Sequence, residues 1–500
     1  MYILALDLGT TGNRAIVFDR RQNVVSRIYR EFPQIYPKPG WVEHDPEVIW
    51  RSVRQILAKT FRRVSVDRIA ALGVTNQRET VLLWDKRTGR PLCNAIVWQC
   101  RRTAPLCEAL KQKGLEDFIH KRSGLFLDPY FSASKIAWFL ENLKGVRKRA
   151  ERGDVLTGTI DAWIVWKLSG GALHVTDVSN ASRTMLLDIS RRTWDEKLCG
   201  IFRVPPKILP RVVPSIGKAG VTAKGLFGTP IPIAGIAGDQ QAAAFAQGCF
   251  KPGILKNTYG TGLFMLENIG RAPRFSDNLL TTAAWAEKDL SHADYAVEGS
   301  VFVGGAAIGW LRDGLGILKK AADSEKLAQS VPSSGGVYFV PALAGLGAPY
   351  WDPGARGTII GITRGTTRAH LVRAALEAIA YQTRDLLEVM RRDMKKDFKV
   401  LRVDGGASGN NFLMQLQADV LGIPVERPRI LETTALGAAG MAGIGAGTWR
   451  DREEFLSFRK LDRVFRPKAR GEEGERFYGR WKEAVRRSRG WELTIDRKKV

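Results

Sequence analysis

Cysteine is scarce in this chain, with five among 500 residues. Their number is odd, and no two of them form a C-x-x-C pair; they are Cys93, Cys100, Cys107, Cys199 and Cys249. The pattern therefore indicates neither a disulfide framework nor a zinc site. Few, scattered thiols fit a reducing compartment, and we expect the protein to be cytoplasmic.

Long apolar runs are also lacking. The first apolar run stops at Leu6 and Asp7 follows at once, which is not the pattern of a signal peptide. The most membrane-like stretch, TTALGAAGMAGIGAGTW at 433–449, is short for a span and rich in glycine and alanine. We interpret it as a buried helix in close contact with its neighbours, and we predict no membrane span.

Acidic residues are few relative to basic ones: 51 Asp and Glu stand against 77 Lys and Arg, a formal net charge of +26. One interpretation is nucleic-acid binding, and the other is a basic, solvated surface. The basic residues are spread along the chain, without a zinc finger, an RNP-like aromatic stretch or a single basic arm. We therefore favour the basic surface and predict no specific nucleic-acid partner.

The first half of the sequence has the alternation of an α/β domain. A hairpin is predicted at its start, with strands near 2–8 and 14–19. The stretch HDPEVIWRSVRQILAKTF then has apolar residues at helical spacing, with Asp45 as the expected N-cap and Pro46 at the first helical position. Helices and strands alternate on to residue 240, which favours an α/β fold.

The second half repeats the opening theme. ILKNTYGTGLFMLEN at 254–268 is again an apolar run, a Gly-Thr-Gly tip and an apolar run, and a long helix is expected over 367–393. Because 500 residues exceed one ordinary core, we predict a duplicated α/β unit. Its domains are expected at 1–246 and 247–500, with a cleft between them.

The two hairpin tips have the composition of phosphate-binding bends. Glycines let the backbone come close to a ligand, successive N–H groups form an anion-binding concavity, and Thr10, Thr11 and Thr261 add hydroxyl donors. Asp7 would repel a phosphate unless a cation lay between them, and Mg²⁺ is often held by one or two carboxylates together with phosphates. The pattern therefore favours Mg-ATP, while an ordinary hairpin turn is the alternative for the first bend. The chain has no G-x-x-x-x-G-K-[ST] loop.

A third glycine-rich junction, VDGGASGNNF, places Gly405, Gly406 and Asn410 between a short strand and a helix. An adenosine group could lie against these glycines, where a Cβ would intrude. The alternative is a tight packing turn.

Three segments have the polar groups that a polyol acceptor needs, since each hydroxyl both donates and accepts hydrogen bonds. NQRET places Arg78 and Glu79 at a strand break, and the alternative is a surface ion pair. DPYFS offers Tyr130, which could instead be a core aromatic. In IAGIAGDQQAAAF, Asp239 and Gln240 follow a buried run, where a carboxylate could accept the proton of an attacking hydroxyl; the alternative is a helix N-cap.

Taken in order, these and other segments resemble the FGGY carbohydrate kinases, and among them the glycerol kinases, over nearly the whole chain. The matching stretches include REFPQIYPKPGWVEHDP, TNQRET, NAIVWQCRRT, DPYFS, NASRTML, GIAGDQQAA, KNTYGTG, GLGAPYWDP, RVDGG, NNFLMQ and ETTALGAA. The resemblance implies two ribonuclease H-like α/β domains of the actin–hexokinase kind around a cleft. It also implies ATP-dependent phosphorylation of glycerol to sn-glycerol 3-phosphate.

The resemblance also implies roles for individual residues. The glycerol hydroxyl ligands would be Arg78, Glu79, Tyr130, Asp239 and Gln240, with Asp239 as the catalytic base and Trp98 and Phe264 against the carbon skeleton. The nucleotide contacts would be Thr10, Thr11, Gly12, Arg14, Thr261, Gly305, Gly406 and Asn410, and Asp7 would be the Mg²⁺ carboxylate.

The chain departs from the family pattern at several positions. Leu8 stands where the family usually has Gln, Gly12 and Asn13 where it has Ser or Thr, and Gly309 where a Gln lies near the nucleotide. These changes bear on nucleotide affinity and donor preference and leave the glycerol residues intact.

The resemblance also has implications for how the protein is regulated and how it assembles. Pro230 and Gly225 replace the Arg and His through which some relatives are controlled by fructose 1,6-bisphosphate and by phosphorylation, so we expect neither control here. A homodimer or homotetramer is implied. Two rival functions stay open at this point: another FGGY kinase acting on a pentulose, and an actin-like ATPase or scaffold without an acceptor pocket.

Overall fold

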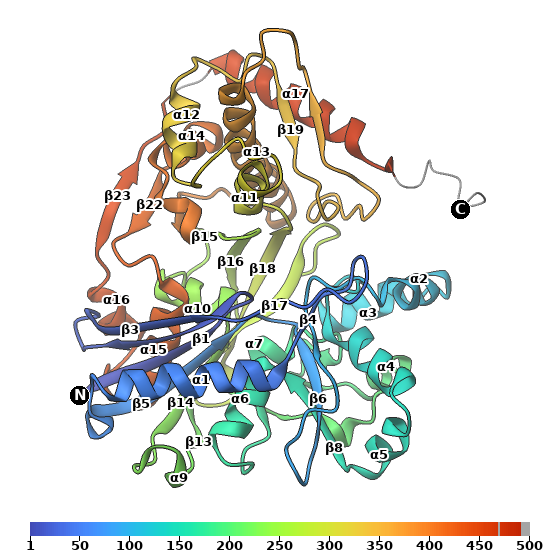
Figure 1. Ribbon diagram of the computed structural model, residues 1–500, viewed down its shortest axis with the longest axis vertical. Helices are drawn as coiled ribbons and strands as arrows, with labels where there is room; N and C mark the ends of the chain where they lie inside the picture. Colours follow the sequence, from blue (N-terminus) through green and yellow to red (C-terminus); the bar gives the residue numbers. More distant parts are fainter. Residues whose placement is uncertain (469–470, 492–500) are drawn as a thin grey trace.

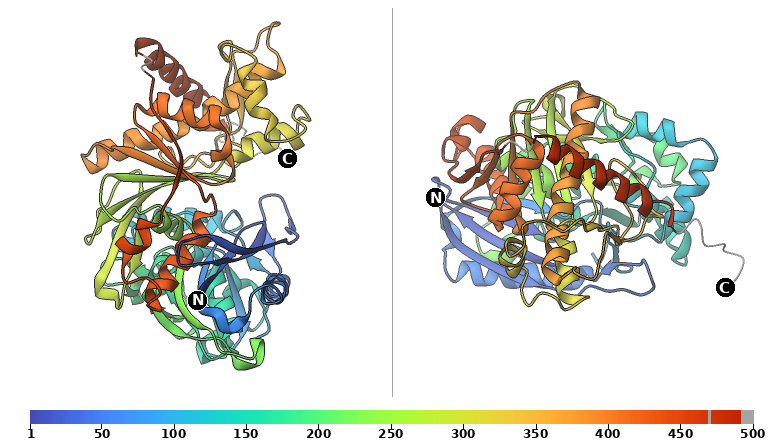
Figure 2. Two further views of the ribbon diagram at one scale, coloured as in Figure 1. Left: turned by 90° about the vertical axis from the view of Figure 1, so that its left-hand side faces the viewer. Right: turned by 90° about the horizontal axis from the view of Figure 1, so that it is seen from above.

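The computed structural model describes residues 1–468 and 471–491. Two large mixed β-sheets, each flanked by helices, form the body of the molecule, one in the lower and one in the upper part of Figure 1. The left view of Figure 2 shows the same division. The predicted α/β class is thus observed.

The first large sheet has six strands in the order β13-β14-β5-β1-β2-β3. In that order they are Ile216–Val221, Pro232–Gly238, Ile69–Asn76, Tyr2–Leu8, Gly12–Phe18 and Val24–Glu31. β1 pairs antiparallel with β2, as the sequence predicts, although β2 begins at Gly12 rather than near residue 14. On its other side β1 runs parallel to β5, and β5 runs parallel to β14.

Helix α1 (Pro46–Phe61) begins where the sequence predicts. The Asp45 carboxylate accepts hydrogen bonds from the backbone N–H groups of Glu47 and Val48, and Pro46 occupies the first turn. The apolar face of the helix, including Ile49 and Val53, is buried in the core against the first sheet.

The second large sheet has seven strands in the order β17-β18-β16-β15-β21-β22-β23. In that order they are Leu280–Ala286, Ala293–Val301, Leu263–Gly270, Ile254–Tyr259, Val400–Asp404, Val425–Pro428 and Leu461–Phe465. The hairpin β15–β16 has a parallel neighbour, β21, beside its first strand, just as β1–β2 has β5. The local topology of the opening therefore recurs, as the repeated Gly-Thr tip indicates.

The glycine- and alanine-rich segment forms helix α15 (Thr433–Gly445), and nearly all of its residues are buried. It packs on the first sheet so tightly that a Cβ on Gly73 of β5 would lie 2.2 Å from the carbonyl oxygen of Ala438. The interpretation as a closely packed buried helix is confirmed. Within the part of the chain that the structure describes, no helix is long and apolar enough to cross a membrane. Helix α15 belongs to the second half of the chain but packs on the sheet of the first half. A cut at residue 246 therefore does not separate all the contacts of the two halves, and the domains 1–246 and 247–500 stay a prediction.

The remaining elements surround these sheets. In the first half a four-stranded sheet has the order β4 (Glu43–His44), β7 (Ala95–Ile96), β6 (Val81–Asp85) and β8 (Val155–Thr159). The two-stranded pairs are β9 (Val175–Asp177) with β12 (Arg211–Val213), β10 (Leu187–Asp188) with β11 (Thr193–Trp194), and β19 (Tyr338–Val340) with β20 (Thr358–Ile360). Helices of the first half are α2 (Ala104–Gln112), α3 (Glu116–Ser123), α4 (Ser132–Asn142), α5 (Val146–Arg152), α6 (Ile160–Leu168), α7 (Val178–Ala181), α8 (Glu196–Ile201), α9 (Lys224–Phe227) and α10 (Asp239–Ala246). Those of the second half are α11 (Gly305–Asp313), α12 (Asp323–Gln329), α13 (Arg368–Met394), α14 (Asn411–Leu421), α16 (Arg452–Ser457) and α17 (Gly471–Ser488).

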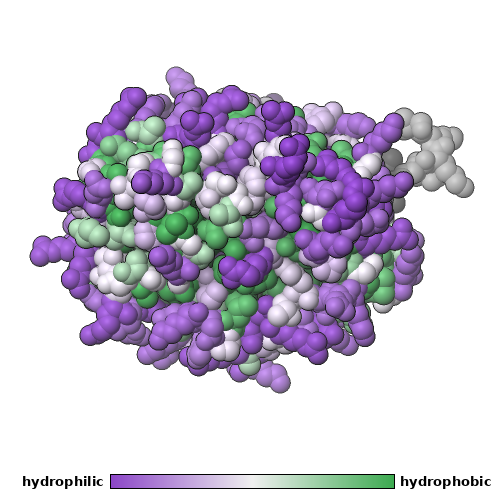
Figure 3. All heavy atoms as spheres, turned by 90° about the horizontal axis from the view of Figure 1, so that it is seen from below, coloured by the Kyte–Doolittle hydropathy of each residue, from purple (hydrophilic) through white to green (hydrophobic). Residues whose placement is uncertain are grey.

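The face of the molecule seen from below has a hydrophilic rim. Figure 3, a view from below, shows polar and charged residues around the rim with apolar residues between them.

Candidate active site

The predicted acceptor residues meet at the carboxyl ends of two neighbouring parallel strands. Arg78 and Glu79 lie in the turn after β5, and Asp239 lies directly after β14. Asn76 and Gly238, the last residues of these strands, are paired in register, so the segments that follow lie side by side. The Nε atom of Arg78 is 3.1 Å from Oδ1 of Asp239.

Arg78 and Glu79 do not form a surface ion pair. Arg78 is 3% exposed and Glu79 1% exposed, so the alternative suggested by their opposite charges is wrong. Glu79 also has a left-handed backbone, with φ of 62°, which is uncommon for a residue with a side chain. Such a conformation persists only where the surroundings fix it, and here the Ser132 hydroxyl donates to the Glu79 carbonyl at 3.0 Å.

Two further charged residues complete this cluster, and their roles are not indicated by the sequence pattern. Arg183 donates from Nε to the Glu79 carboxylate at 2.6 Å. Glu298, from β18 of the second sheet, accepts two hydrogen bonds from Arg78, at 2.5 and 3.0 Å. Arg183 lies in the quoted stretch NASRTML, which signals the position and not its partner, whereas nothing in the strand pattern around Glu298 marks it.

Asp239 is the one partly exposed carboxylate of the cluster, with 29% of its side chain exposed. It is the first residue of α10, and Gly238 is the N-cap, so the alternative of an N-cap aspartate is wrong. Burial raises its pKa above the ordinary value, and the positive charges of Arg78 and Lys256 oppose that rise. A carboxylate with a raised pKa is a better proton acceptor than an ordinary surface aspartate.

Gln240 follows Asp239 and is held from the second half of the chain. Its side-chain oxygen accepts a hydrogen bond from Nζ of Lys256 at 2.5 Å. Lys256 is itself buried in β15, and the sequence analysis does not identify it. Because its oxygen is bonded to Lys256, the Gln240 amide has its N–H groups left to offer a hydroxyl ligand.

Three aromatic side chains stand together beside these polar groups. The Trp98 ring is 5.7 Å from that of Tyr130 and 6.2 Å from that of Phe264 between centroids, with edge-on geometry. Trp98 and Tyr130 also line a cavity of about 400 Å³. Tyr130 is buried in the core, so the interpretation as a core aromatic is confirmed, and its role as an acceptor ligand stays a prediction.

The first bend is linked to the acceptor cluster through Trp98. The indole N–H of Trp98 donates to the Thr10 hydroxyl at 3.0 Å. Arg14, in β2, donates to the Asp7 carboxylate at 3.0 Å across the hairpin. Thr11 is exposed at the tip of the turn, and the Gly9 N–H donates to the Gly12 carbonyl and closes it.

The departures from the family pattern at this bend have a packing reason. A Cβ on Gly12 would lie 2.7 Å from the Tyr29 hydroxyl and 2.7 Å from the Arg30 carbonyl oxygen. A serine or threonine at this position is therefore incompatible with the neighbouring strand as it stands. Asn13 is fully buried and donates to the Ile49 carbonyl of α1, so its side chain belongs to the core rather than to the bend.

The second bend opens onto a cavity of about 590 Å³. Four predicted nucleotide residues line it, namely Thr261, Gly305, Gly406 and Asn410, and Gly309 lines it too. Thr10, Thr11, Gly12 and Arg14 are not among its lining residues. The structure thus brings the predicted second-half nucleotide residues together. Trp98, which binds Thr10 of the first bend, lies 6.2 Å from the ring of Phe264 in β16, the strand that follows the second bend.

The glycine pair at the third junction has divided functions. A Cβ on Gly405 would lie 2.6 Å from the Tyr259 carbonyl oxygen. Gly405 is therefore required for the tight packing of the turn against β15. A Cβ on Gly406 would meet nothing within 4 Å, and this residue faces the cavity. The Asn410 side chain caps α14 by accepting from the Leu413 N–H at 2.9 Å, which fixes it at the cavity wall.

The carboxylates present fit a magnesium ion held partly by phosphate. Among the described residues there is no group of three or more His, Cys, Asp or Glu side chains that could hold a metal by themselves. Asp7 is a buried carboxylate that receives one hydrogen bond from Arg14, at Oδ2, so further lone pairs on its two oxygens can serve a cation. Such a site suits Mg²⁺, which commonly binds one or two carboxylates plus substrate phosphates.

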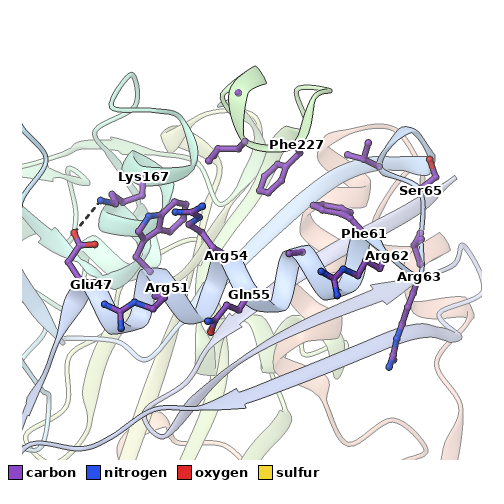
Figure 4. Close-up of a pocket in the computed structure, with 16 residues that line it drawn as sticks. Glu47, Arg51, Arg54, Gln55, Phe61, Arg62, Arg63, Ser65, Lys167 and Phe227 are labelled. Atoms are coloured by element: carbon purple, nitrogen blue, oxygen red, sulfur yellow. Dashed lines mark hydrogen bonds and ion pairs between the residues drawn. The ribbon is translucent and has the colours of Figure 1, made fainter.

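A larger cavity, of about 1280 Å³, lies elsewhere, along α1 (Figure 4). Arginines of α1 and of the turn after it line this cavity together with Phe61 and Phe227, and Gly225 is part of its wall. None of the predicted catalytic, substrate or nucleotide residues lines it. Its size therefore does not make it the active site, because the predicted acceptor residues meet after the ends of β5 and β14.

Comparison with known proteins gives matches over nearly the whole chain. Residues 2–246 match the N-terminal domain, and residues 255–446 the C-terminal domain, of the FGGY family of carbohydrate kinases. Glycerol kinase 2 of Thermotoga maritima is 58% identical over 98% of this chain and 99% of its own length. A glycerol kinase of Carboxydothermus hydrogenoformans is 55% identical over the same shares.

Solved structures agree with these matches. A glycerol kinase of Plasmodium falciparum, solved with ADP, superposes with a TM-score of 0.89 at 35% identity, covering 97% of this chain and 98% of that one. A ligand-bound xylulose kinase of Lactobacillus acidophilus superposes with a TM-score of 0.83 at 23% identity, covering 96% and 97%. The second likeness shows the fold alone. Together they confirm the predicted fold of two ribonuclease H-like α/β domains.

Proposed function

Because the chain belongs to the FGGY family of carbohydrate kinases, we propose that it transfers the γ-phosphoryl group of ATP to glycerol and forms sn-glycerol 3-phosphate. Full-length relatives named glycerol kinase, at 58% and 55% identity, support this choice of acceptor. The observation that carries the proposal is the contact between Arg78 and the partly exposed Asp239, beside the aromatic wall of Trp98, Tyr130 and Phe264.

In the proposed reaction Asp239 is the general base. It takes the proton of the attacking terminal hydroxyl, whose oxygen forms a bond to the γ-phosphorus while the bond from that phosphorus to the β–γ bridging oxygen breaks. ADP leaves with the electron pair of that bond. Positioning and charge neutralisation supply most of the catalysis in phosphoryl transfer, and a general base adds about 10²–10⁴ in rate.

The remaining acceptor residues would orient glycerol. Arg78 donates to one hydroxyl and Glu79 accepts from another, while the Gln240 amide and the Tyr130 hydroxyl complete the set. Trp98 and Phe264 would cover the carbon skeleton and exclude water. The polar groups of the cluster are fixed by ion pairs, which favours an acceptor with few hydroxyls to pair.

The nucleotide would lie in the cavity at the second bend, with its phosphates directed toward the first. Thr261, Gly305, Gly406 and Asn410 line that cavity, and backbone N–H groups of the bend at Thr10, Thr11 and Gly12 would receive the phosphates. Asp7 would hold Mg²⁺, which when bound neutralises charge on the β- and γ-phosphates. Arg14 holds the Asp7 carboxylate in place.

A pentulose kinase is the second candidate, because the fold also superposes on a xylulose kinase. A pocket built for a longer sugar must pair its additional hydroxyls, and each one buried without a partner costs roughly 1–3 kcal/mol. The test is a coupled assay of ADP release with Mg-ATP and, in turn, glycerol, dihydroxyacetone and xylulose. We expect kcat/KM for glycerol to exceed that for xylulose at least about 100-fold. A preference for xylulose refutes the proposal, and ATP binding without any acceptor-dependent ADP release favours the scaffold instead.

Regulation and assembly remain predictions. Gly225 lies in the wall of the large cavity along α1, and neither it nor Pro230 has a side chain that could carry or pair with a phosphate. We therefore expect activity to be unaffected by low concentrations of fructose 1,6-bisphosphate. The predicted homodimer or homotetramer is checked by light scattering of the purified protein.

A further inference from the structure

Glu298 enters the acceptor site from the opposite half of the molecule. It lies in β18 of the second sheet, whereas Arg78 and Arg183 belong to the first half of the chain. Its carboxylate accepts four hydrogen bonds: two from Arg78, one from Arg183 Nη2 at 3.1 Å and one from the Ser300 hydroxyl at 2.8 Å. Its side chain is fully buried, so every one of these bonds is made away from water.

The bonds divide the guanidinium of Arg78 between two carboxylates. Nη1 and Nη2 are both engaged by Glu298 in a two-pronged pair, which leaves Nε to face Asp239 at 3.1 Å. A bidentate pair fixes the plane of a guanidinium as well as its position. The direction in which Arg78 meets the reacting groups is therefore set by Glu298.

Arg183 does the same for Glu79. Its Nε pairs with the Glu79 carboxylate at 2.6 Å and its Nη2 with Glu298, while its own side chain is fully buried. Glu79 needs such support because its backbone is in the left-handed region. Two arginines thus serve three carboxylates, and the carboxylate left with a single charged contact is Asp239, the partly exposed one.

We propose that Glu298 and Arg183 are positioning residues of the acceptor site, through which the second sheet fixes Arg78 and Glu79 for polyol binding. Neither residue needs to touch the substrate. Since Glu298 comes from the second half, the acceptor site takes its working geometry only when the two halves are in this relative arrangement. The inference rests on the proposed function, because it assigns Arg78 and Glu79 to the acceptor.

The experiment compares Glu298→Gln with a matched control, Glu267→Gln. Glu267 is a buried carboxylate on the adjacent strand β16 that pairs with Lys396 at 3.4 Å, away from the cluster. We expect Glu298→Gln to lower kcat/KM for glycerol at least about 100-fold while the KM for ATP changes less than threefold. Glu267→Gln should leave both constants within threefold of wild type, and Glu298→Asp should recover at least about tenfold over the glutamine variant.

Two further outcomes separate positioning from charge balance. Removing Glu298 alone leaves two buried guanidiniums short of a partner, which can prevent folding. The double variant Arg183→Gln/Glu298→Gln keeps the net charge of the cluster, so it should fold and still show a KM for glycerol raised at least tenfold. Wild-type constants in the double variant, or in Glu298→Gln, overturn the inference.

The same assay distinguishes failure of the inference from failure of the proposed function. Each variant is measured with the acceptor that the wild type phosphorylates best. If that acceptor is xylulose, the proposed function is wrong. The positioning roles are then tested by asking whether the variants raise the KM for xylulose while the KM for ATP stays within threefold.

Discussion

Replacing the proposed base, Asp239→Asn, is the sharpest test of the chemistry. The substitution keeps the size of the side chain and one acceptor oxygen, which can still receive the Gln240 N–H that Asp239 binds at 2.8 Å. It removes the negative charge and the ability to take a proton. The same oxygen lies 3.1 Å from Arg78 Nε, so Arg78 loses the charge of a partly exposed partner but keeps both bonds to Glu298.

The expected magnitudes for turnover and stability therefore differ. A positioned general base contributes about 10²–10⁴ in rate, so kcat should fall by that factor, equivalent to about 3–5 kcal/mol of barrier. A partly exposed ion pair contributes about 1 kcal/mol or less, so the midpoint of thermal unfolding should shift by only a few degrees. The KM for glycerol should change less than about fivefold, because an amide still accepts a hydrogen bond from a hydroxyl.

The assay is steady-state ADP release at saturating Mg-ATP, with ATP affinity measured separately by calorimetry. Asp294→Asn is the control, because Asp294 is also a carboxylate paired with an arginine, at 2.8 Å from Arg452, and lies outside the cluster. It should retain kcat within twofold. A kcat of Asp239→Asn within tenfold of wild type would falsify the assignment of the base.

Burial raises the pKa of Asp239, and this predicts the pH dependence of the wild type. The base acts only when it is deprotonated. We therefore expect kcat/KM for glycerol to fall as the pH is lowered through a value above the ordinary aspartate pKa of about 3.9. A profile that is flat down to pH 4 contradicts this assignment.

Three other changes test the packing and the links around the site. Trp98→Phe removes the 3.0 Å hydrogen bond to the Thr10 hydroxyl and should raise the KM for glycerol about threefold to tenfold in the same assay. An unchanged KM would show that this hydrogen bond does not contribute to acceptor binding. Gly437→Ala would place a Cβ 1.7 Å from the Ala242 carbonyl oxygen and should lower the free energy of unfolding in urea by at least about 1–3 kcal/mol. Burial raises the pKa of Asp385 to about 7, so the folded protein holds a proton that the unfolded chain releases near pH 4. The free energy of unfolding of the wild type should therefore fall between pH 4.5 and 7.5. Parallel urea titrations should show a smaller fall for the Asp385→Asn variant.

Local structure around the site could largely be predicted from the sequence. The start of α1 at Asp45 and Pro46 follows from capping chemistry alone, and the hairpins follow from apolar runs around small-residue tips. The strand break at NQRET and the buried strand before Asp239 were also predictable, because both are short-range patterns. These predictions depend on neighbours along the chain, which the sequence displays directly.

What could not be predicted depends on contacts between distant strands. Glu298 lies 220 residues from Arg78 in sequence, and its alternating strand pattern is that of any residue in β18. The surface-pair interpretation of Arg78 and Glu79 was wrong for the same reason, since their burial comes from partners elsewhere in the chain. Gly12 gives a similar case, because its missing side chain is explained by Tyr29 on the next strand.

The two sheets use the same topological position for different tasks. In the first, the turn after β5, the parallel neighbour of β1, holds Arg78 and Glu79 of the acceptor site. In the second, the turn after β21, the parallel neighbour of β15, holds Gly405 and Gly406 at the nucleotide cavity. Ligands in α/β sheets gather at the carboxyl ends of strands, where side chains and N–H groups are free of the sheet. Duplication of one unit thus gives two such edges; in the function proposed above, the charged turn of the first would meet the polyol and the glycine turn of the second the nucleotide.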